Sequence, residues 1–161
     1  MLRNDDAIFD TLKGHGVPFV IVGGHAVNYH GHIRLTEDTD VVWRRTPESE
    51  ATLFAALRQL DAKYLGNKID PATGIEREYP VTLPYIQATH LMMLWTANGF
   101  LDLFDYNPAS PAESVDAIFE TSVSDGRFQF ASLEWLVRMK KASARSKDLD
   151  DLANLPDPDS R

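Results

Sequence analysis

The chain has 161 residues, of which 43% are hydrophobic and 25% are charged, a composition typical of one globular domain. The lack of cysteine excludes disulfides, thiolate metal ligands and cysteine nucleophiles. A formal net charge of −8 argues against a broad, non-specific nucleic-acid surface. No apolar run is long enough to cross a bilayer and the acidic N-terminus is unlike a signal peptide, so we expect a cytoplasmic protein without membrane contact.

The N-terminal half predicts alternating strands and helices. A β-branched run leads into Gly23-Gly24, which indicates a buried strand followed by a tight turn. Pro47 and the acidic residues after it are typical of a helix start, and apolar residues then recur on one helical face. The expected elements are a strand at 18–22, a short helix at 25–30, a strand at 39–43, a helix at 47–63 and a loop at 66–80.

The C-terminal half predicts a hairpin followed by helices. Asn98-Gly99 separates two apolar runs, which is a strong hairpin signal, and Ser132 and Ser146 are suitable helix caps. The expected elements are strands at 90–95 and 100–104, a helix at 110–121, a strand at 126–130 and two terminal helices. We therefore expect one α/β (α+β) domain over residues 1–161, with its core at about 18–155. It would have a small mixed sheet flanked by helices and a helical C-terminal end.

Two carboxylates, Asp38 and Asp40, are two residues apart in the second expected strand. Residues at this spacing point to the same face of a strand. Their repulsion costs about 1–4 kcal/mol at close range, and a cation between them removes it. Ligand sets made only of oxygen favour Mg²⁺ or Mn²⁺. A metal site is one interpretation of the pair, and two solvated acids on an edge strand are the other.

A third carboxylate, Asp102, stands between apolar neighbours in the strand expected at 100–104. A lone acid in such a run is costly unless it is exposed or paired with a cation. If this strand lies beside that of Asp38 and Asp40, three carboxylates meet at one point, as in two-metal phosphoryl-transfer sites. Asp105 would face the other way, as a turn residue.

Two further features favour an anion site. Gly23-Gly24, between a strand and a helix start, exposes backbone N–H groups that can cradle phosphates, although a simple tight turn explains the pair by itself. Residues 138–147 carry five basic side chains and no acid. This run indicates either a local phosphate site or a solvated helix face.

The histidines offer a competing interpretation. His25, His30 and His32 precede the two aspartates and would serve as ligands in a metal-dependent hydrolase. However, His25 and His30 are five residues apart and do not stack on one helix face, and no His-Glu-x-x-His pair occurs. We interpret them mainly as structural or surface residues.

In combination, these motifs resemble the nucleotidyltransferase superfamily, the fold group of DNA polymerase beta. The similarity is greatest to small bacterial members related to AbiEii-type abortive-infection toxins, which carry Gly-Gly-x-Ala and then Arg-x-Thr-x-Asp-x-Asp. The matching residues here are Gly23, Gly24, Ala26, Arg34, Thr36, Asp38 and Asp40, and near the C-terminus Met139, Lys140, Arg145, Lys147, Asp148 and Asp151.

The resemblance implies transfer of a nucleotide from a nucleoside triphosphate to an acceptor hydroxyl, dependent on Mg²⁺ or Mn²⁺. Asp38 and Asp40 would hold the metals, while Asp102 would complete the metal site and help to activate the acceptor. Arg34 would brace the loop before the metal strand or form a structural ion pair.

The resemblance also implies a triphosphate site. Gly23 and Gly24 would cradle the triphosphate, and Lys140 and Lys147 would neutralise its charge. On an unbroken helix these two lysines, two turns apart, would lie on one side.

Three functions follow from these patterns. The first is the nucleotidyltransferase, with an RNA, a protein or another molecule as acceptor and a possible toxin–antitoxin partner protein. The second is a non-catalytic nucleotidyltransferase-like binding module that acts as an antitoxin, because Gly23-Gly24-His25 stands where many active members have Gly-Ser. The third is the His/Asp metal-dependent hydrolase.

Overall fold

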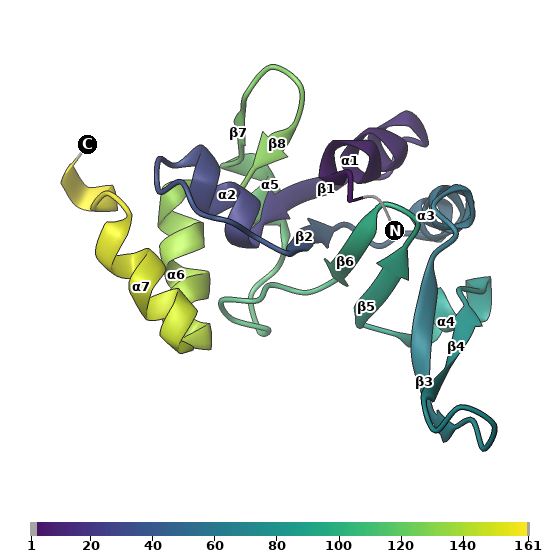
Figure 1. The fold of residues 1–161 in the computed structure, drawn as a ribbon. Coiled ribbons are helices and arrows are strands. Elements are labelled where there is room, and N and C mark those ends of the chain that lie inside the picture. The colour runs from purple at the N-terminus through teal and green to yellow at the C-terminus, as the bar shows by residue number, and fades with distance from the viewer. Residues whose placement is uncertain (1–2, 161) are drawn as a thin grey trace.

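The computed structural model describes residues 3–160 as a mixed sheet with helices on both faces (Figure 1). Across these residues, no helix combines the length and the apolar character that crossing a bilayer requires. The helices are α1 (Asp5–Gly14), α2 (Gly23–Tyr29), α3 (Pro47–Gln59), α4 (Leu83–Ala88), α5 (Asp116–Glu120), α6 (Leu133–Ser143), α7 (Ser146–Asn154) and the 3₁₀ turn η1 (Pro158–Ser160). The strands are β1 (Phe19–Val22), β2 (Asp38–Trp43), β3 (Lys63–Ile69), β4 (Glu76–Pro80), β5 (Leu91–Thr96), β6 (Gly99–Phe104), β7 (Val123–Ser124) and β8 (Gln129–Phe130).

The strands of the described residues form a sheet in the order β4-β3-β5-β6-β2-β1-β8-β7. Strand β2 pairs in parallel with β6 and antiparallel with β1, while β5 and β6 form an antiparallel hairpin. In the β2–β6 register, Asp40 lies opposite Asp102 and Asp38 lies opposite Phe100. The three predicted carboxylates are therefore carried by neighbouring strands in the middle of the sheet.

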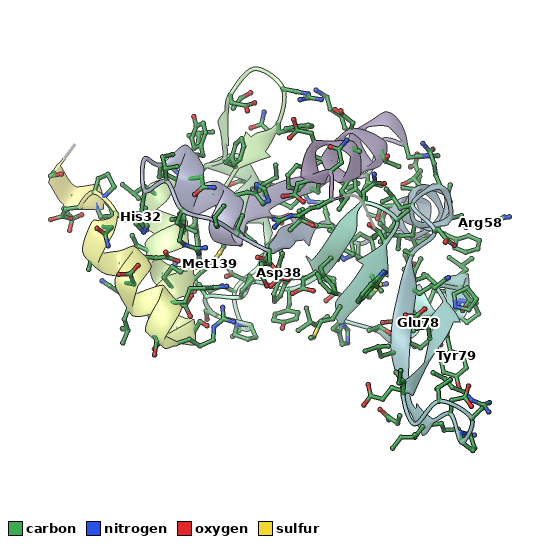
Figure 2. The ribbon with its side chains drawn as sticks, in the orientation of Figure 1. His32, Asp38, Arg58, Glu78, Tyr79 and Met139 are labelled. Atoms are coloured by element: carbon green, nitrogen blue, oxygen red, sulfur yellow. The ribbon has the colours of Figure 1, made fainter. Side chains whose placement is uncertain are left out.

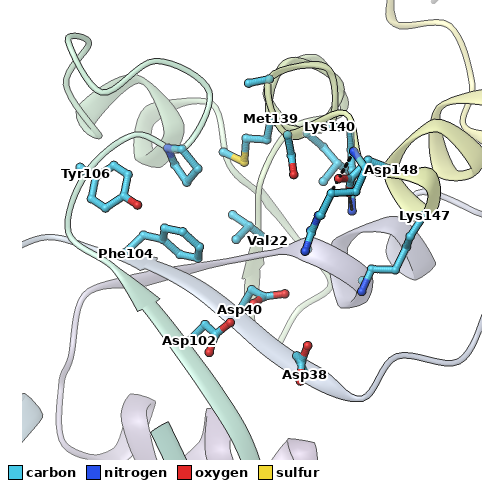
Figure 3. A pocket seen from close by; sticks show the side chains of 17 residues that line it. Val22, Asp38, Asp40, Asp102, Phe104, Tyr106, Met139, Lys140, Lys147 and Asp148 are labelled. Carbon is cyan, nitrogen blue, oxygen red and sulfur yellow. Dashed lines mark hydrogen bonds and ion pairs between the residues drawn. The ribbon is translucent and has the colours of Figure 1, made fainter. Parts of the chain in front are cut away.

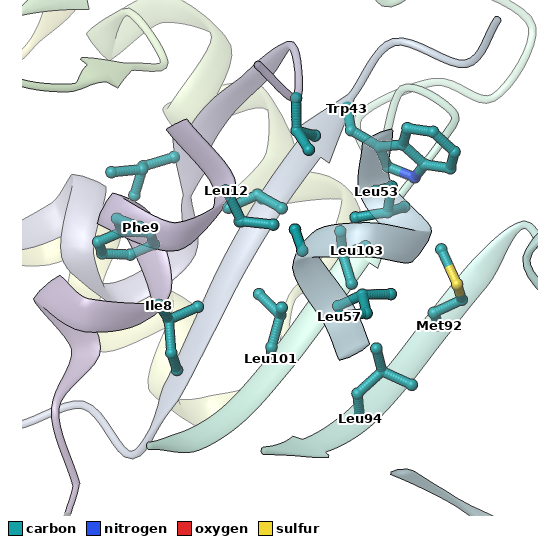
Figure 4. Packing of buried hydrophobic residues seen from close by; sticks show 14 of the residues in the cluster. Ile8, Phe9, Leu12, Trp43, Leu53, Leu57, Met92, Leu94, Leu101 and Leu103 are labelled. Atoms are coloured by element: carbon teal, nitrogen blue, oxygen red, sulfur yellow. The ribbon is translucent and has the colours of Figure 1, made fainter. Parts of the chain in front are cut away.

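One face of the sheet bears the larger hydrophobic core. Alternate residues of β2, β5 and β6 point to this face and pack against α1 and α3 (Figure 4). Leu12 of α1, Leu57 of α3 and Leu101 and Leu103 of β6 are fully buried there. Helix α1 begins after the Asn4 cap and extends the core N-terminal of the expected boundary.

The opposite face is covered over only part of its width. Val20, Val22 and Val42 pack there against α5 and α6, in a second cluster with Ile118 and Met139. Beyond β6, the side chains that β5 and β3 direct to this face are largely exposed. The carboxylates lie where the covered and the open parts of this face meet.

Several expected elements are confirmed. The strands expected at 18–22 and 39–43 are β1 and β2, and the hairpin around Asn98-Gly99 joins β5 to β6. Ser132 caps α6 by accepting a hydrogen bond from a backbone N–H one turn later. A break separates α6 from α7, with Arg145 rather than Ser146 at the cap position.

Other expectations are wrong at their boundaries. The helix expected at 47–63 ends at Gln59, because Asp61, with φ 50°, turns the chain and β3 begins two residues later. The loop expected at 66–80 is mostly the β3–β4 hairpin, which extends away from the rest of the sheet (Figure 1). Its side chains are mostly solvent-exposed, so no apolar alternation marks it. The helix expected at 110–121 is reduced to α5, and the strand expected at 126–130 to β8.

Candidate active site

Asp38, Asp40 and Asp102 face one cavity of about 270 Å³ (Figure 3). Two-residue spacing places Asp38 and Asp40 on the same face of β2, and the parallel register brings Asp102 beside Asp40. Asp105, just beyond β6, accepts hydrogen bonds from Arg45 and His90 instead and takes no part in the cavity. The predicted convergence of three carboxylates is present in the structure.

Gly23 and Gly24 lie at the rim of this cavity, as the first two residues of α2 directly after β1. Gly23 has φ +65°, a left-handed conformation that favours glycine, and a Cβ there would overlap the carboxylate of Asp40. A Cβ on Gly24 would overlap the side chain of Thr36. Both glycines thus allow the backbone to approach the loop and strand that carry the aspartates.

Burial and mutual repulsion disfavour the charged carboxylates in the metal-free protein. Burial, the charges of Asp40 and Asp38 and a hydrogen bond to Asp40 raise the pKa of Asp102 to about 7. Burial and the charge of Asp38 also raise the pKa of Asp40. At neutral pH this pair therefore retains a proton part of the time, and a cation bound between the carboxylates would replace it.

The wall opposite the carboxylates carries basic side chains from the α6–α7 junction. Lys147 is exposed, makes no ion pair with any described residue, and is directed toward the aspartates in Figure 3. Arg145 also lines the cavity and donates a hydrogen bond from Nε to Asp148 at 2.9 Å. The motif that contains Arg145 was noted in the sequence, but its place in the cavity was not predicted.

Lys140 reaches the cavity wall, but its ammonium group is engaged elsewhere. Its Nζ lies 3.0 Å from Asp148 Oδ1 and 2.9 Å from Asp151 Oδ2, and all three residues are buried. The helix is also not continuous, because Ala144 adopts a left-handed conformation with φ 48° between α6 and α7. The condition of an unbroken helix is therefore not met: both lysines line the cavity, but they come from different helices and have different environments.

An ion-pair network around the buried carboxylates of Asp148 and Asp151 joins α7 to the segment before β2. Arg34 donates from Nε and Nη2 to the two carboxylate oxygens of Asp151, at 2.6 and 2.8 Å. Burial alone would raise the pKa of Asp151, but Arg34 and Lys140 hold it below its usual value. Burial is likewise outweighed at Asp148, where Arg145 and Lys140 help to hold the pKa well below its usual range. The network fixes α7, and with it Lys147, relative to the carboxylate strand.

The histidines lie away from the carboxylate cavity, whose lining within residues 3–160 contains none of them. His25 packs edge-on against Phe9, and His30 Nε2 lies 2.8 Å from the carbonyl oxygen of Ala131. His32 lies beside α7 (Figure 2), close enough to Asp150 and Asp151 for a metal cluster. Because Asp151 is already paired with two cationic side chains, this cluster is poorly suited to a metal ion.

The fold is that of the nucleotidyltransferases. The antibiotic-resistance factor ANT(2'')-Ia has this fold in a solution structure, with a TM-score of 0.57 and 16% identity over 92% of this chain and 78% of that one. A crystal structure of ANT(2'')-Ia in complex with adenylyl-2''-tobramycin gives a TM-score of 0.54 and 15% identity, over 92% of this chain and 83% of that one. An antigenic nucleotidyltransferase-like protein from Paracoccidioides brasiliensis gives 0.54 and 19%, over 94% and 76%.

No protein-family profile matches the chain, and no curated protein sequence matches it significantly. At the identities of the solved structures, similarity establishes the fold alone. Activity depends on the side chains of the site rather than on the fold.

Proposed function

We propose that this chain is a Mg²⁺-dependent nucleotidyltransferase, which moves a nucleotide from a nucleoside triphosphate to an acceptor hydroxyl. The observation that carries the proposal is the pairing of Asp40 with Asp102 across two strands, beside Asp38, in a cavity whose opposite wall bears Arg145 and Lys147. The adenylylated compound bound to one structural neighbour supports nucleotidyl transfer as the reaction class.

The donor set fits a divalent metal. Asp38, Asp40 and Asp102 offer only carboxylate oxygens, which Mg²⁺ and Mn²⁺ prefer. The raised pKa values of Asp40 and Asp102 indicate that burial and the neighbouring carboxylates disfavour their negative charge. A cation bound between them would stabilise that charge. When bound, Mg²⁺ neutralises charge on the carboxylates and on the phosphates they face.

The residues of the cavity then have distinct roles. Lys147 and Arg145 bind the phosphates, whose charge the exposed ammonium and guanidinium groups complement. The Gly23-Gly24 turn lets the triphosphate approach the backbone. The acceptor oxygen forms a bond to the α-phosphorus, the bond from that phosphorus to the bridging oxygen breaks, and pyrophosphate leaves. Asp102 accepts the hydroxyl proton.

Lys140 has a positioning role in this proposal. Its ammonium group binds Asp148 and Asp151, so it holds α7 in place and acts on the triphosphate through Lys147. This differs from the direct phosphate contact that the sequence resemblance implies.

Thermal melting with MgCl₂ and each of the four ribonucleoside triphosphates tests the proposal. We expect the wild type to gain about 2.7 kcal/mol at 100 times the dissociation constant. For a domain of this size, the gain raises the melting temperature by about 5–10 °C. Asp38→Asn should show little shift, whereas Glu76→Gln, which removes a charge from the exposed strand β4, should behave as wild type.

The outcome also decides between the alternatives. A wild-type shift that needs both metal and triphosphate, with pyrophosphate release upon addition of an acceptor, supports the enzyme. A protein that ignores millimolar Mg²⁺–triphosphate contradicts the proposal and favours the non-catalytic module of a toxin–antitoxin pair.

A further inference from the structure

Exposed apolar side chains lie directly beside the carboxylates, on the open part of the sheet face. Met93, Trp95, Phe100 and Leu65 are 64%, 42%, 37% and 55% exposed. They line a second cavity of about 210 Å³, which Asp38 and Asp102 also line. Side-by-side exposure of large apolar groups in a hollow marks a ligand or partner surface more often than a chance arrangement.

The strand registers explain why these side chains share a face. Phe100 pairs with Asp38 across β2 and β6, and with Trp95 across β5 and β6. Met93 pairs with Asp102, so it too points to the open face. The ring centroids of Trp95 and Phe100 are 4.8 Å apart, and the ring planes meet at 80°. Together with Met93 and Leu65, these rings form an apolar platform of fixed shape.

The two cavities lie on different sides of the carboxylates. The cavity with Arg145 and Lys147 is bounded by the β1–α2 turn and the α6–α7 junction, whereas the second is bounded by β3, β5 and β6. In the sheet, β1 and β5 lie on opposite sides of the β2–β6 pair. Nucleotidyl transfer requires the attacking and leaving oxygens to be roughly in line, so the acceptor enters from the side away from the pyrophosphate.

Charge restricts which acceptors fit the second cavity. Its polar lining consists mainly of the carboxylates of Asp38, Asp102 and Glu78, with Lys63 as the cation. Figure 2 shows Glu78 on the hairpin that borders this part of the sheet. In the metal-free protein, the three carboxylates would repel a phosphorylated acceptor, whereas they would not repel a neutral or cationic one.

We propose that Met93, Trp95 and Phe100, with Leu65, form the acceptor subsite of the transfer reaction proposed above, and that the acceptor is a small, non-phosphorylated alcohol carrying a ring with an apolar face. The ring stacks on Trp95 and Phe100, and its hydroxyl then lies beside Asp38 and Asp102. The inference rests on the proposed function for the reaction, but the platform itself is tested by binding alone.

Tryptophan fluorescence measures this binding, with phenyl β-D-glucopyranoside as the neutral ring alcohol. Trp95 is exposed, whereas Trp43 and Trp135 are buried, so a ring on the platform changes mainly the signal of Trp95. We expect a saturable change in the wild type and roughly tenfold weaker binding in Phe100→Ala, which keeps the reporter. Trp95→Phe should lose the signal. Ile75→Ala, an equally apolar change at an exposed residue of the β3–β4 connection, should bind as wild type.

Charge selectivity is measured in EDTA, where Asp38 and Asp102 hold no metal, with the 6-phosphate of the same glucoside and with a short RNA. We expect both to bind more weakly than the neutral compound. Equal or tighter binding of either one, no saturable signal with the neutral compound, or unchanged binding in Phe100→Ala would overturn the inference. So would a wild-type dimer that Phe100→Ala dissociates, because a second copy of the chain would then occupy the platform.

The same variants separate this inference from the proposed function. Phe100→Ala should keep the melting shift with Mg²⁺–triphosphate, because Phe100 does not line the triphosphate cavity. A wild type that binds the glucoside but ignores Mg²⁺–triphosphate contradicts the proposed function and leaves a ring-binding site. A wild type that binds Mg²⁺–triphosphate but not the glucoside contradicts only the acceptor subsite.

Discussion

Replacing Asp102 with Asn removes one of three facing carboxylates and keeps the shape of the side chain. In the folded, metal-free protein, burial and the neighbouring aspartates raise the pKa of Asp102 from 3.8 to about 7. In the unfolded chain the group ionises freely above its ordinary value. Wild-type stability therefore falls as the pH rises through the window between these two values, because the folded state retains a proton that the unfolded state has lost.

The size of the effect follows from the shift. At about 1.4 kcal/mol per pKa unit, the full shift corresponds to about 4 kcal/mol. Because Asp102 is only half-buried and solvent screens its neighbours, we reduce this to about 2 kcal/mol. Asp102→Asn should thus be more stable than wild type by that amount at pH 8, which corresponds to about 4–8 °C in melting temperature, and should show only a small gain at pH 4, close to the ordinary pKa of 3.8.

Thermal melting in EDTA at pH 4 and pH 8 measures the difference. Glu76→Gln is the matched control, since it removes the same charge from an exposed strand position and should show no pH-dependent gain. Adding MgCl₂ should stabilise the wild type and reverse the order of the two proteins. An equal difference at both pH values, or a variant that is less stable at pH 8, would refute the claim that burial and neighbouring carboxylates raise the pKa of Asp102.

Other substitutions test the remaining parts of the site. Lys147→Ala should weaken Mg²⁺–ATP binding by roughly tenfold in calorimetry, whereas Lys141→Ala, outside the cavity, should not; equal losses would contradict a phosphate contact. Asp151→Asn should cost about 3–5 kcal/mol in urea unfolding, because the buried Lys140 and the partly buried Arg34 lose their shared carboxylate. Gly23→Ala should cost about 1–3 kcal/mol and distort Asp40, so a near-neutral change would contradict the close approach of turn and strand.

Local sequence signals predicted the elements that carry the chemistry. Asp38 and Asp40 lie in a short β-branched strand, and their two-residue spacing puts them on one face wherever that strand lies. The Asn98-Gly99 turn likewise predicts the hairpin of β5 and β6, because its conformation is set by the turn residues themselves. Helix α1 also had a local signal in its Asn4 cap and the apolar pair Ile8 and Leu12, although it was not predicted.

The exposed β3–β4 hairpin had no comparable signal. Neither strand buries a continuous apolar face, so period-two alternation is missing, and the glycines and prolines of residues 66–80 favoured a loop. Pairing with β5 at Lys63 and Trp95, which are far apart in the chain, is what continues the sheet there.

Only the tertiary structure decided which of the predicted residues meet in the cavity and which are paired inside the protein. Whether Asp102 meets Asp40 depends on a parallel pairing between strands about 60 residues apart, which no local pattern encodes. Lys140 and Lys147 look alike in the sequence, but the left-handed Ala144 separates their helices. Lys140 pairs with two buried carboxylates, whereas Lys147 is exposed at the cavity. The sequence by itself determined which side chains carry charge, and long-range packing determined which of those charges are neutralised inside the protein and which remain for a ligand.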